Sequence, residues 1–266
     1  MPQVSAQPRA EGTASLVVSE GSRIVDLRQQ GALKLVFPHC AAGRACEAVM
    51  LNTAGGITAG DRFTIGASVD RGQLVMTTQA AERAYRAKEG AGQVTTHLTV
   101  GPEGRLHWLP QETILFDGSA LKRRLDADLH GDAAALFVET VLFGRLAMGE
   151  TSPEVDYRED WRIRRDGRLI YADALRISGD SGTLLAPAAV ANGGRAVASV
   201  VYAAPDAEAL ADRARDLLPE HAGLSLISHD LLAVRMVAAD GFDLRAGLVP
   251  LLKTLARAEL PKCWML

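Results

Sequence analysis

Short apolar runs, bounded by glycine, proline or polar clusters, follow one another along most of the chain. They are rich in Val, Ile, Leu and Thr, which is typical of strands. No regular alternation of strand and helix is present, which argues against a doubly wound parallel sheet. The pattern therefore predicts a mainly β fold of many short strands. The predicted strands are residues 15–19, 23–27, 33–37, 47–51, 63–69, 74–78, 94–100, 105–109, 113–116, 121–129, 134–142, 154–165, 168–177, 196–202, 224–227 and 231–237.

Two segments in the C-terminal third have the periodicity of amphipathic helices. The first spans residues 207–218 and is preceded by Asp206, where the helix dipole favours a carboxylate. The second spans about residues 242–259 and contains Pro250, which predicts either a kink or a later start. Both apolar stripes are interpreted as packing surfaces. Residues 260–266 are apolar for a terminus, so we expect them to dock on the chain or bind a partner.

Composition limits the possible classes of protein. A chain of 266 residues with 48% hydrophobic residues can bury a substantial core. The 29 basic and 32 acidic residues give a net charge of −3, which argues against nucleic acid or an anionic membrane as the main partner. No apolar run approaches the roughly 18 residues of a membrane span.

The N-terminus and the cysteines indicate a compartment. The N-terminal stretch is polar and lacks the apolar core of a signal peptide. Residues 1–13 are predicted to be a disordered tail. Residues 14–266 are predicted to form a single domain. The three cysteines, Cys40, Cys46 and Cys263, fit a reducing compartment better than a disulfide framework, so we expect a cytoplasmic protein.

A glycine-rich stretch over residues 52–63 resembles a phosphate-binding loop at first sight. Gly55 and Gly60 have the spacing of a P-loop, which next requires Lys and then Ser or Thr. Here Asp61 and Arg62 follow instead, and a carboxylate at that point would repel phosphate. The sequence therefore favours a tight loop between strands over a nucleotide site.

A serine hydrolase is one alternative. Residues 179–182 read Gly-Asp-Ser-Gly, and His39 precedes a cysteine, as in trypsin-like enzymes. With Asp126 or Asp128 between them, the order is His, Asp, Ser. The residues that follow Ser181 and the lack of a disulfide set do not fit that class, and Asp-Ser-Gly is also ordinary turn chemistry.

A structural metal site is not favoured. His97 and His107 lie on separate predicted strands, and His39, Cys40 and Cys46 cluster only loosely. No Cys-x-x-Cys or His-x-x-x-His pair is present, as structural zinc sites require. Spacing does not test a transient site made of a few convergent carboxylates or thiolates.

Several charged side chains interrupt apolar runs. Burying an unpaired carboxylate costs several kcal/mol, so such residues should be paired, hydrated or functional. A paired structural network and a functional polar lining both remain open. The adjacent arginines of strand 121–129 predict one solvated face. The carboxylates in question are Glu82, Glu112, Asp117 and Glu139, and the adjacent arginines are Arg123 and Arg124.

Four motifs, in order, resemble the UreD (UreH) family of urease accessory proteins, and the similarity covers about residues 14–264. The chain also ends in a similar Leu-Pro-Lys-Cys-Trp. It has Thr53-Ala54 where many members have Pro-Pro. It has Lys262-Cys263 where many members, which end in Pro-Arg-x-Trp, have Arg and the variable residue. The motifs are TAGGITAGD at residues 53–61, TTQAAERAYR at 77–86, WLPQETILFDGS at 108–119 and FGRLAMG at 143–149.

The resemblance implies a fold and a role. Many short strands would be wound in a helix-like arrangement with two α-helices. The protein would be a non-catalytic scaffold that binds urease apoprotein and the accessory proteins UreF and UreG. With them it would support nickel delivery into urease, by way of a polar internal passage. No cofactor would be tightly bound, although Ni²⁺ could be held transiently.

The resemblance also suggests candidate residues. Carboxylate oxygens exchange metal quickly and suit a passage better than thiolates, which would trap nickel. The hypothetical passage or transient nickel contacts are Asp61, Glu82, Glu112, Asp117 and Glu139. The hypothetical partner contacts are Leu251, Leu255 and Trp264. Besides the hydrolase using Ser181 and His39, a β-rich binding module with no metal role remains an alternative.

Overall fold

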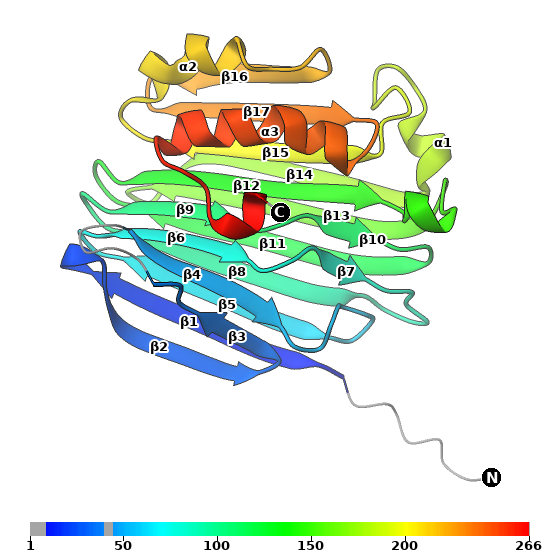
Figure 1. Ribbon diagram of the computed structural model, residues 1–266, viewed down its shortest axis with the longest axis horizontal. Helices are drawn as coiled ribbons and strands as arrows, with labels where there is room; N and C mark the ends of the chain where they lie inside the picture. The colour runs from blue at the N-terminus through cyan, green and yellow to red at the C-terminus, as the bar shows by residue number, and fades with distance from the viewer. Residues whose placement is uncertain (1–8, 40–44, 266) are drawn as a thin grey trace.

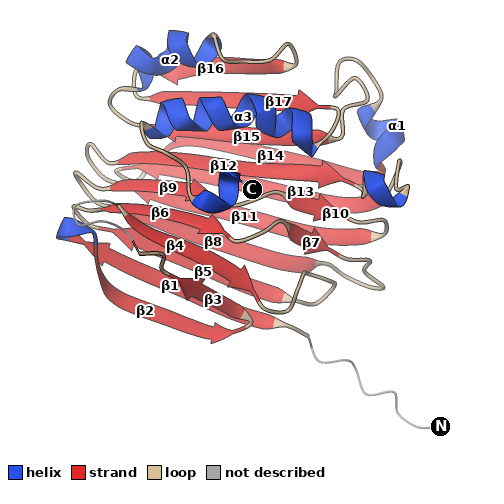
Figure 2. Cartoon of the chain, viewed as in Figure 1, coloured by secondary structure: helices blue, strands red, loops and turns tan. Residues whose placement is uncertain are grey.

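The computed structural model describes residues 9–39 and 45–265, and within them the chain is mainly β, as predicted. Two mixed sheets lie face to face (Figures 1 and 2). Sheet A has the spatial order β14 (Arg168–Asp180), β13 (Glu154–Arg165), β11 (Ser119–Leu129), β8 (Gly92–Val100), β5 (Arg62–Val69), β1 (Glu11–Ser19) and β2 (Arg23–Gly31).

Sheet B contains the remaining strands. Two short strands, β10 (Thr113–Leu115) and β7 (Glu82–Ala84), extend it beside β12. The main order is β16 (Ala222–Ser228), β17 (Leu231–Ala238), β15 (Ala196–Ala203), β12 (Ala134–Phe143), β9 (Arg105–Leu109), β6 (Gln73–Thr78), β4 (Cys46–Asn52) and β3 (Leu33–Val36). The sequence pattern did not predict β7, which is only three residues long.

The helix-like winding is visible in the strand pairing. From β4 to β13 the long strands alternate between the sheets, and from β6 onward each pairs in parallel with the preceding long strand of its own sheet. Each turn of the chain thus contributes one strand to each sheet. Antiparallel hairpins finish the sheets at both ends, among them β1–β2 and β13–β14.

The two longer helices cover the outer face of sheet B (Figure 1). The two predicted helices are α2 (Ala207–Arg215) and α3 (Gly241–Ala256). α3 begins where the Asp240 side chain accepts a hydrogen bond from the Asp243 N–H at 2.9 Å, so Pro250 lies inside it and does not start it. Short elements complete the fold: α1 (Ser181–Leu185), η1 (Glu20–Ser22), η2 (Leu146–Met148) and η3 (Lys262–Met265).

Two apolar cores result from these three layers. The larger core fills the space between the sheets, where side chains alternate inward along each strand. The second lies between sheet B and the helices. Both faces of the central strands β12 and β15 are therefore buried, which explains their nearly continuous apolar sequence.

The proposed partner residues belong to the second core. Leu251 and Leu255 are 0% exposed and Trp264 is 3% exposed, so all three contact the chain itself. Their side chains are not presented to a partner in this structure. The predicted docking of the terminal segment is present through η3, whose Trp264 closes this core.

The predicted boundary of the N-terminal tail falls inside a strand. β1 begins at Glu11, because Gly12 and its neighbours pair with both β2 and β5. Residue 14 is therefore not the start of the ordered region. Residues 1–8 of the predicted tail, Cys40 and residue 266 lie outside the described residues.

Candidate functional site

A polar cluster interrupts the core between the two sheets. Period-two alternation places its members among apolar neighbours that face inward. Arg123 of β11 lies between Leu121 and Leu125, and both leucines belong to this core. Glu139 of β12 and Glu159 of β13 are only 4% exposed each.

Arg123 is the centre of the cluster. Its Nη2 lies 2.5 Å from the Glu139 carboxylate and its Nε lies 3.8 Å from that of Glu159. Its Nη1 donates a hydrogen bond to the Thr113 hydroxyl. Two aromatic donors complete the arrangement: the Trp108 indole N–H to Glu139 at 2.9 Å, and the Tyr157 hydroxyl to Glu159 at 3.1 Å.

The electrostatics of the cluster favour a further positive charge. Burial raises the pKa of Glu139, and burial together with the Glu139 charge raises the pKa of Glu159 to about 7. Burial opposes the charge of Arg123, yet the Glu139, Tyr157 and Glu159 oxygens hold its pKa above the ordinary value. The Arg123 guanidinium thus lies against two buried carboxylates. Its charge also lowers the pKa of a third carboxylate, that of Glu82, against the effect of burial.

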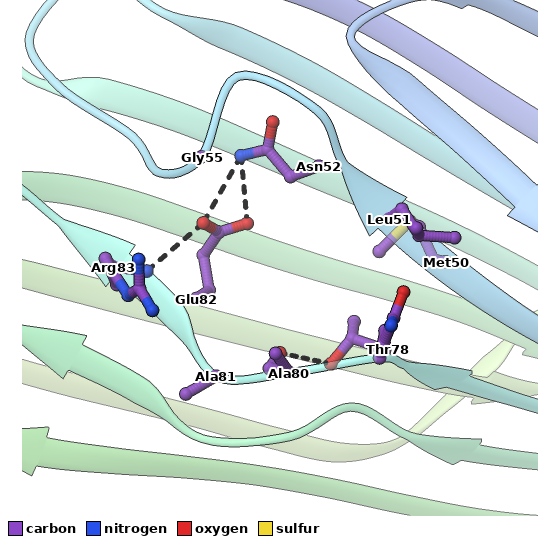
Figure 3. Close-up of a pocket in the computed structure, with 10 residues that line it drawn as sticks. Met50, Leu51, Asn52, Gly55, Thr78, Ala80, Ala81, Glu82 and Arg83 are labelled. Carbon is purple, nitrogen blue, oxygen red and sulfur yellow. Dashed lines mark hydrogen bonds between the residues drawn. The ribbon is translucent and has the colours of Figure 1, made fainter. Parts of the chain in front are cut away.

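Glu82 connects this cluster to a surface pocket of about 190 Å³ (Figure 3). Asn52 Nδ2 donates to both carboxylate oxygens of Glu82, at 3.1 and 3.2 Å, and the Arg83 N–H donates at 3.1 Å. Burial raises the pKa of Glu82, while the Asn52 hydrogen bond and the Arg123 charge oppose that rise. Gly55 of the glycine-rich loop and Thr78 also line this pocket.

A second, inner cavity of about 30 Å³ adjoins this pocket. Glu82 and Thr78 line both spaces, and Arg123, Trp108 and Gln111 line the inner one. A volume of this size is that of about one water molecule. Polar groups therefore succeed one another from the surface pocket, past Glu82, to the Arg123 cluster.

The other candidate carboxylates lie elsewhere. Asp61 is buried, and its two oxygens accept hydrogen bonds from the N–H groups of Ala10 and Thr58, both at 2.8 Å. It closes the glycine-rich loop and ties it to the N-terminal segment. Its carboxylate is therefore occupied by backbone donors and is not part of the cluster around Arg123.

Glu112 and Asp117 are also separate from the cluster. Glu112 lies 3.3 Å from Arg245 of α3, on the helix-covered side of sheet B, although its carbonyl oxygen accepts from the Glu82 N–H. Asp117 pairs with Arg86 near the surface and accepts from the Glu154 N–H at 3.0 Å. Of the five predicted carboxylates, the structure brings together only Glu82 and Glu139.

Sequence reasoning missed three central members of the cluster: Arg123, Glu159 and Asn52. The adjacent Arg123 and Arg124 predicted a solvated face, which is correct only for Arg124, whose side chain is 60% exposed. Since Leu121 and Leu125 flank Arg123 at spacing two, alternation placed Arg123 on the inward face. Glu159 has the same signal between Tyr157 and Trp161, two of the largest fully buried side chains.

The described geometry does not support the hydrolase. Ser181 is 1% exposed, and its hydroxyl donates to the Pro153 carbonyl oxygen at 2.8 Å. His39 is exposed at the end of β3 and is not among the hydrogen-bond partners of Ser181 in the described residues. Within residues 9–39 and 45–265, no three His, Cys, Asp or Glu side chains are grouped to hold a metal ion.

His107 is a buried histidine rather than a ligand. It is 5% exposed on β9, and its Nε2 has no hydrogen-bond partner among the described residues. Burial, aided by Arg105, lowers its pKa to about 4. The folded chain therefore holds this imidazole neutral.

We expect His107 to cause a loss of stability in acid. The unfolded histidine takes up a proton near its ordinary pKa of about 6.5, whereas the folded one does not until about pH 4. Stability is thus present above pH 6.5 and is lost as the pH falls, by about 2 kcal/mol between pH 7 and pH 5. Urea unfolding at both pH values would show a shallower loss for His107→Phe. His97→Phe, at an exposed position of β8, should retain the loss, and an unchanged loss in His107→Phe would contradict the assignment.

In the described part of the chain, no helix is long and apolar enough to cross a membrane.

Comparison with known proteins covers almost the entire chain. The family model described as "UreD urease accessory protein" matches residues 10–265. A urease accessory protein UreD of Ruegeria pomeroyi is 47% identical over 250 residues, which is 93% of this chain and 97% of the relative. Proteins of the same description from Roseobacter denitrificans and Rhizobium leguminosarum are each 46% identical over 265 residues, with 96% of each relative covered.

Proposed function

The chain belongs to the UreD family of urease accessory proteins, and from this premise we propose that it is a non-catalytic, cytoplasmic scaffold that binds urease apoprotein, UreF and UreG and conducts nickel toward urease. Nickel is the cargo of this function, and the protein keeps no resident cofactor. The observation that carries the proposal is the succession of polar groups from the surface pocket through Glu82 to the Arg123 cluster.

The chemistry of these groups suits a transient cation. Glu82, Glu139 and Glu159 offer carboxylate oxygens, which bind divalent cations without the tight hold of thiolates. Arg123 neutralises only part of their charge, so an entering cation replaces a proton or shares the carboxylates with the guanidinium. Glu82 is the first of the three that a cation would meet from the pocket, and Asn52 orients it.

We expect Glu82→Gln to slow urease activation by more than tenfold. At an effective dielectric constant of 20, a unit charge about 4 Å away interacts with a carboxylate by about 4 kcal/mol. Each 1.36 kcal/mol is tenfold in a rate. The variant keeps the size of Glu82 and one oxygen that can accept from Asn52 and the Arg83 N–H, so the fold and the complex should persist. Urease, UreF and UreG would be co-expressed with the variant, and the initial rate of activation and the nickel content of urease measured.

Glu89→Gln is the matched control, since Glu89 is an exposed glutamate seven residues away. Co-expression without the chain sets the baseline. If urease gains its full nickel without this chain, the accessory role fails in this system. If Glu82→Gln activates urease as fast as Glu89→Gln, the passage at Glu82 is wrong, and a β-rich binding module with no metal role becomes the better description.

A further inference from the structure

An exposed apolar groove of about 460 Å³ lies where η2 meets the start of α3. Figure 1 places the start of α3 and α1 at the same end of the sheets. Phe242 is 82% exposed, Met148 71% and Leu146 44%. Contiguous exposed apolar side chains of this kind mark interaction sites. The apolar lining is made by Ile114, Leu142, Phe143, Leu146, Met148 and Phe242.

The backbone holds one wall of this groove in place. Gly144 has φ 82°, and a Cβ there would meet the Glu150 carbonyl oxygen at 2.6 Å, so only glycine fits. Arg145 pairs with Glu150, and its guanidinium lies 4.1 Å from the centre of the Phe116 ring. The segment is thereby folded so that Leu146 and Met148 face solvent. Such a preformed wall lowers the cost of binding.

Arg195 adds a positively charged side chain to the lining of the groove. Its guanidinium lines both this groove and an adjoining pocket of about 120 Å³, which Thr151 also lines. Its buried Nη1 has no hydrogen-bond acceptor among the described residues. Arg145, the other cation of the groove, is already neutralised by Glu150. An occupant that brings a carboxylate therefore complements the charge of Arg195.

We propose that this groove binds a segment of another protein that carries apolar side chains next to an aspartate or glutamate. The apolar side chains cover Phe242, Met148 and Leu146, and the carboxylate pairs with Arg195 in the adjoining pocket. The inference rests on the proposed scaffold function, because it requires a protein partner. It adds the surface through which this chain binds its partner. That surface does not include the predicted partner contacts Leu251, Leu255 and Trp264.

Site-specific cross-linking would test the proposal. A benzoylphenylalanine photo-cross-linker in place of Phe242 would be irradiated in the full chain mixed with urease apoprotein, UreF and UreG. Cross-linked peptides would be identified by mass spectrometry. The same probe in place of Leu169, a 48% exposed side chain of β14, is the control. We expect Phe242, and not Leu169, to cross-link to a segment of one of these proteins with an acidic residue beside apolar ones.

Charge reversal would then test Arg195. Arg195→Glu should weaken the complex by about tenfold or more, and replacing the cross-linked acidic residue with arginine should restore it. Phe242→Ser changes an 82% exposed side chain, so it tests the groove even if Arg195→Glu fails to fold.

Three results would contradict the proposal that this groove binds a segment of another protein. They are cross-links to a second copy of this chain, cross-links to its residues 1–8, and an intact complex with no cross-link at Phe242. In each case the scaffold function stands. Failure of the unmodified chain to form any complex would overturn both.

Discussion

Replacing Arg123 with leucine is expected to lower the free energy of unfolding by about 3–5 kcal/mol, the usual cost of removing one partner from a buried ion pair. Arg123 lies against the buried carboxylates of Glu139 and Glu159. Without it, both carboxylates lose the guanidinium that lies against them. Urea unfolding followed by tryptophan fluorescence would measure the change, because Trp108 and Trp161 lie in the same core.

The effect should grow with pH. In the variant, the buried carboxylates fold in the protonated form, so their folded pKa values exceed the unfolded ones. Stability is then present below the unfolded pKa and is lost as the pH rises through the folded pKa. The variant should therefore be closer to the parent at pH 6 than at pH 8.

Arg124→Leu is the matched control one residue away. Arg124 pairs with Asp126, but its side chain is 60% exposed, so the expected loss is at most about 1 kcal/mol. Adding Glu139→Gln and Glu159→Gln to Arg123→Leu should recover part of the stability. Should Arg123→Leu cost no more than Arg124→Leu, the buried pairing would not hold this core together.

Replacing Trp264 with alanine should cost about 3–5 kcal/mol, as for other fully buried tryptophans. The indole is 3% exposed and closes the core between sheet B and α3. The indole N–H donates to the Leu109 carbonyl oxygen at 3.0 Å. The main-chain carbonyl oxygen of Trp264 accepts from Arg245 at 2.7 Å. Thermal or urea unfolding would measure the loss.

Two further variants separate the contributions of Trp264. Met265→Ala changes the next residue, which is 57% exposed, and should alter stability by no more than about 0.5 kcal/mol. Trp264→Phe keeps the apolar ring but removes the donor, so it should cost about 1 kcal/mol beyond the volume change. An alanine variant as stable as Met265→Ala would show that the terminal segment is not part of the folded core.

The fold could be predicted further than the site. Strand and helix positions follow from local periodicity, and most predicted strands are present within a few residues. The short β7 was missed because its sequence, Glu-Arg-Ala, lacks the apolar residues by which the equally short β10 was predicted, and the residues of α1 read as turn chemistry. The winding was implied only by family resemblance, since parallel pairing joins segments that are distant in sequence, such as β1 and β5.

The members of the site are brought together by tertiary contacts, which the sequence pattern does not reveal. Glu82 and Glu139 were among the predicted carboxylates, but Asp61 is used by backbone donors and Glu112 by Arg245. Which carboxylates share a guanidinium depends on the register of β11 against β13 and on the separation of the sheets, and neither is written in any local pattern. Arg123 was therefore misread as solvated, although its own strand placed it inward.

The position of Trp264 has a consequence for synthesis. The outer face of sheet B is incompletely covered until α3 and η3 leave the ribosome, because these elements follow every strand of both sheets in the sequence. A nascent chain that already holds every strand thus presents part of an apolar sheet to its surroundings for the time that α3 and η3 take to emerge. Such surfaces promote aggregation and attract chaperones. In this chain, the second core can close only after every strand of both sheets has been made.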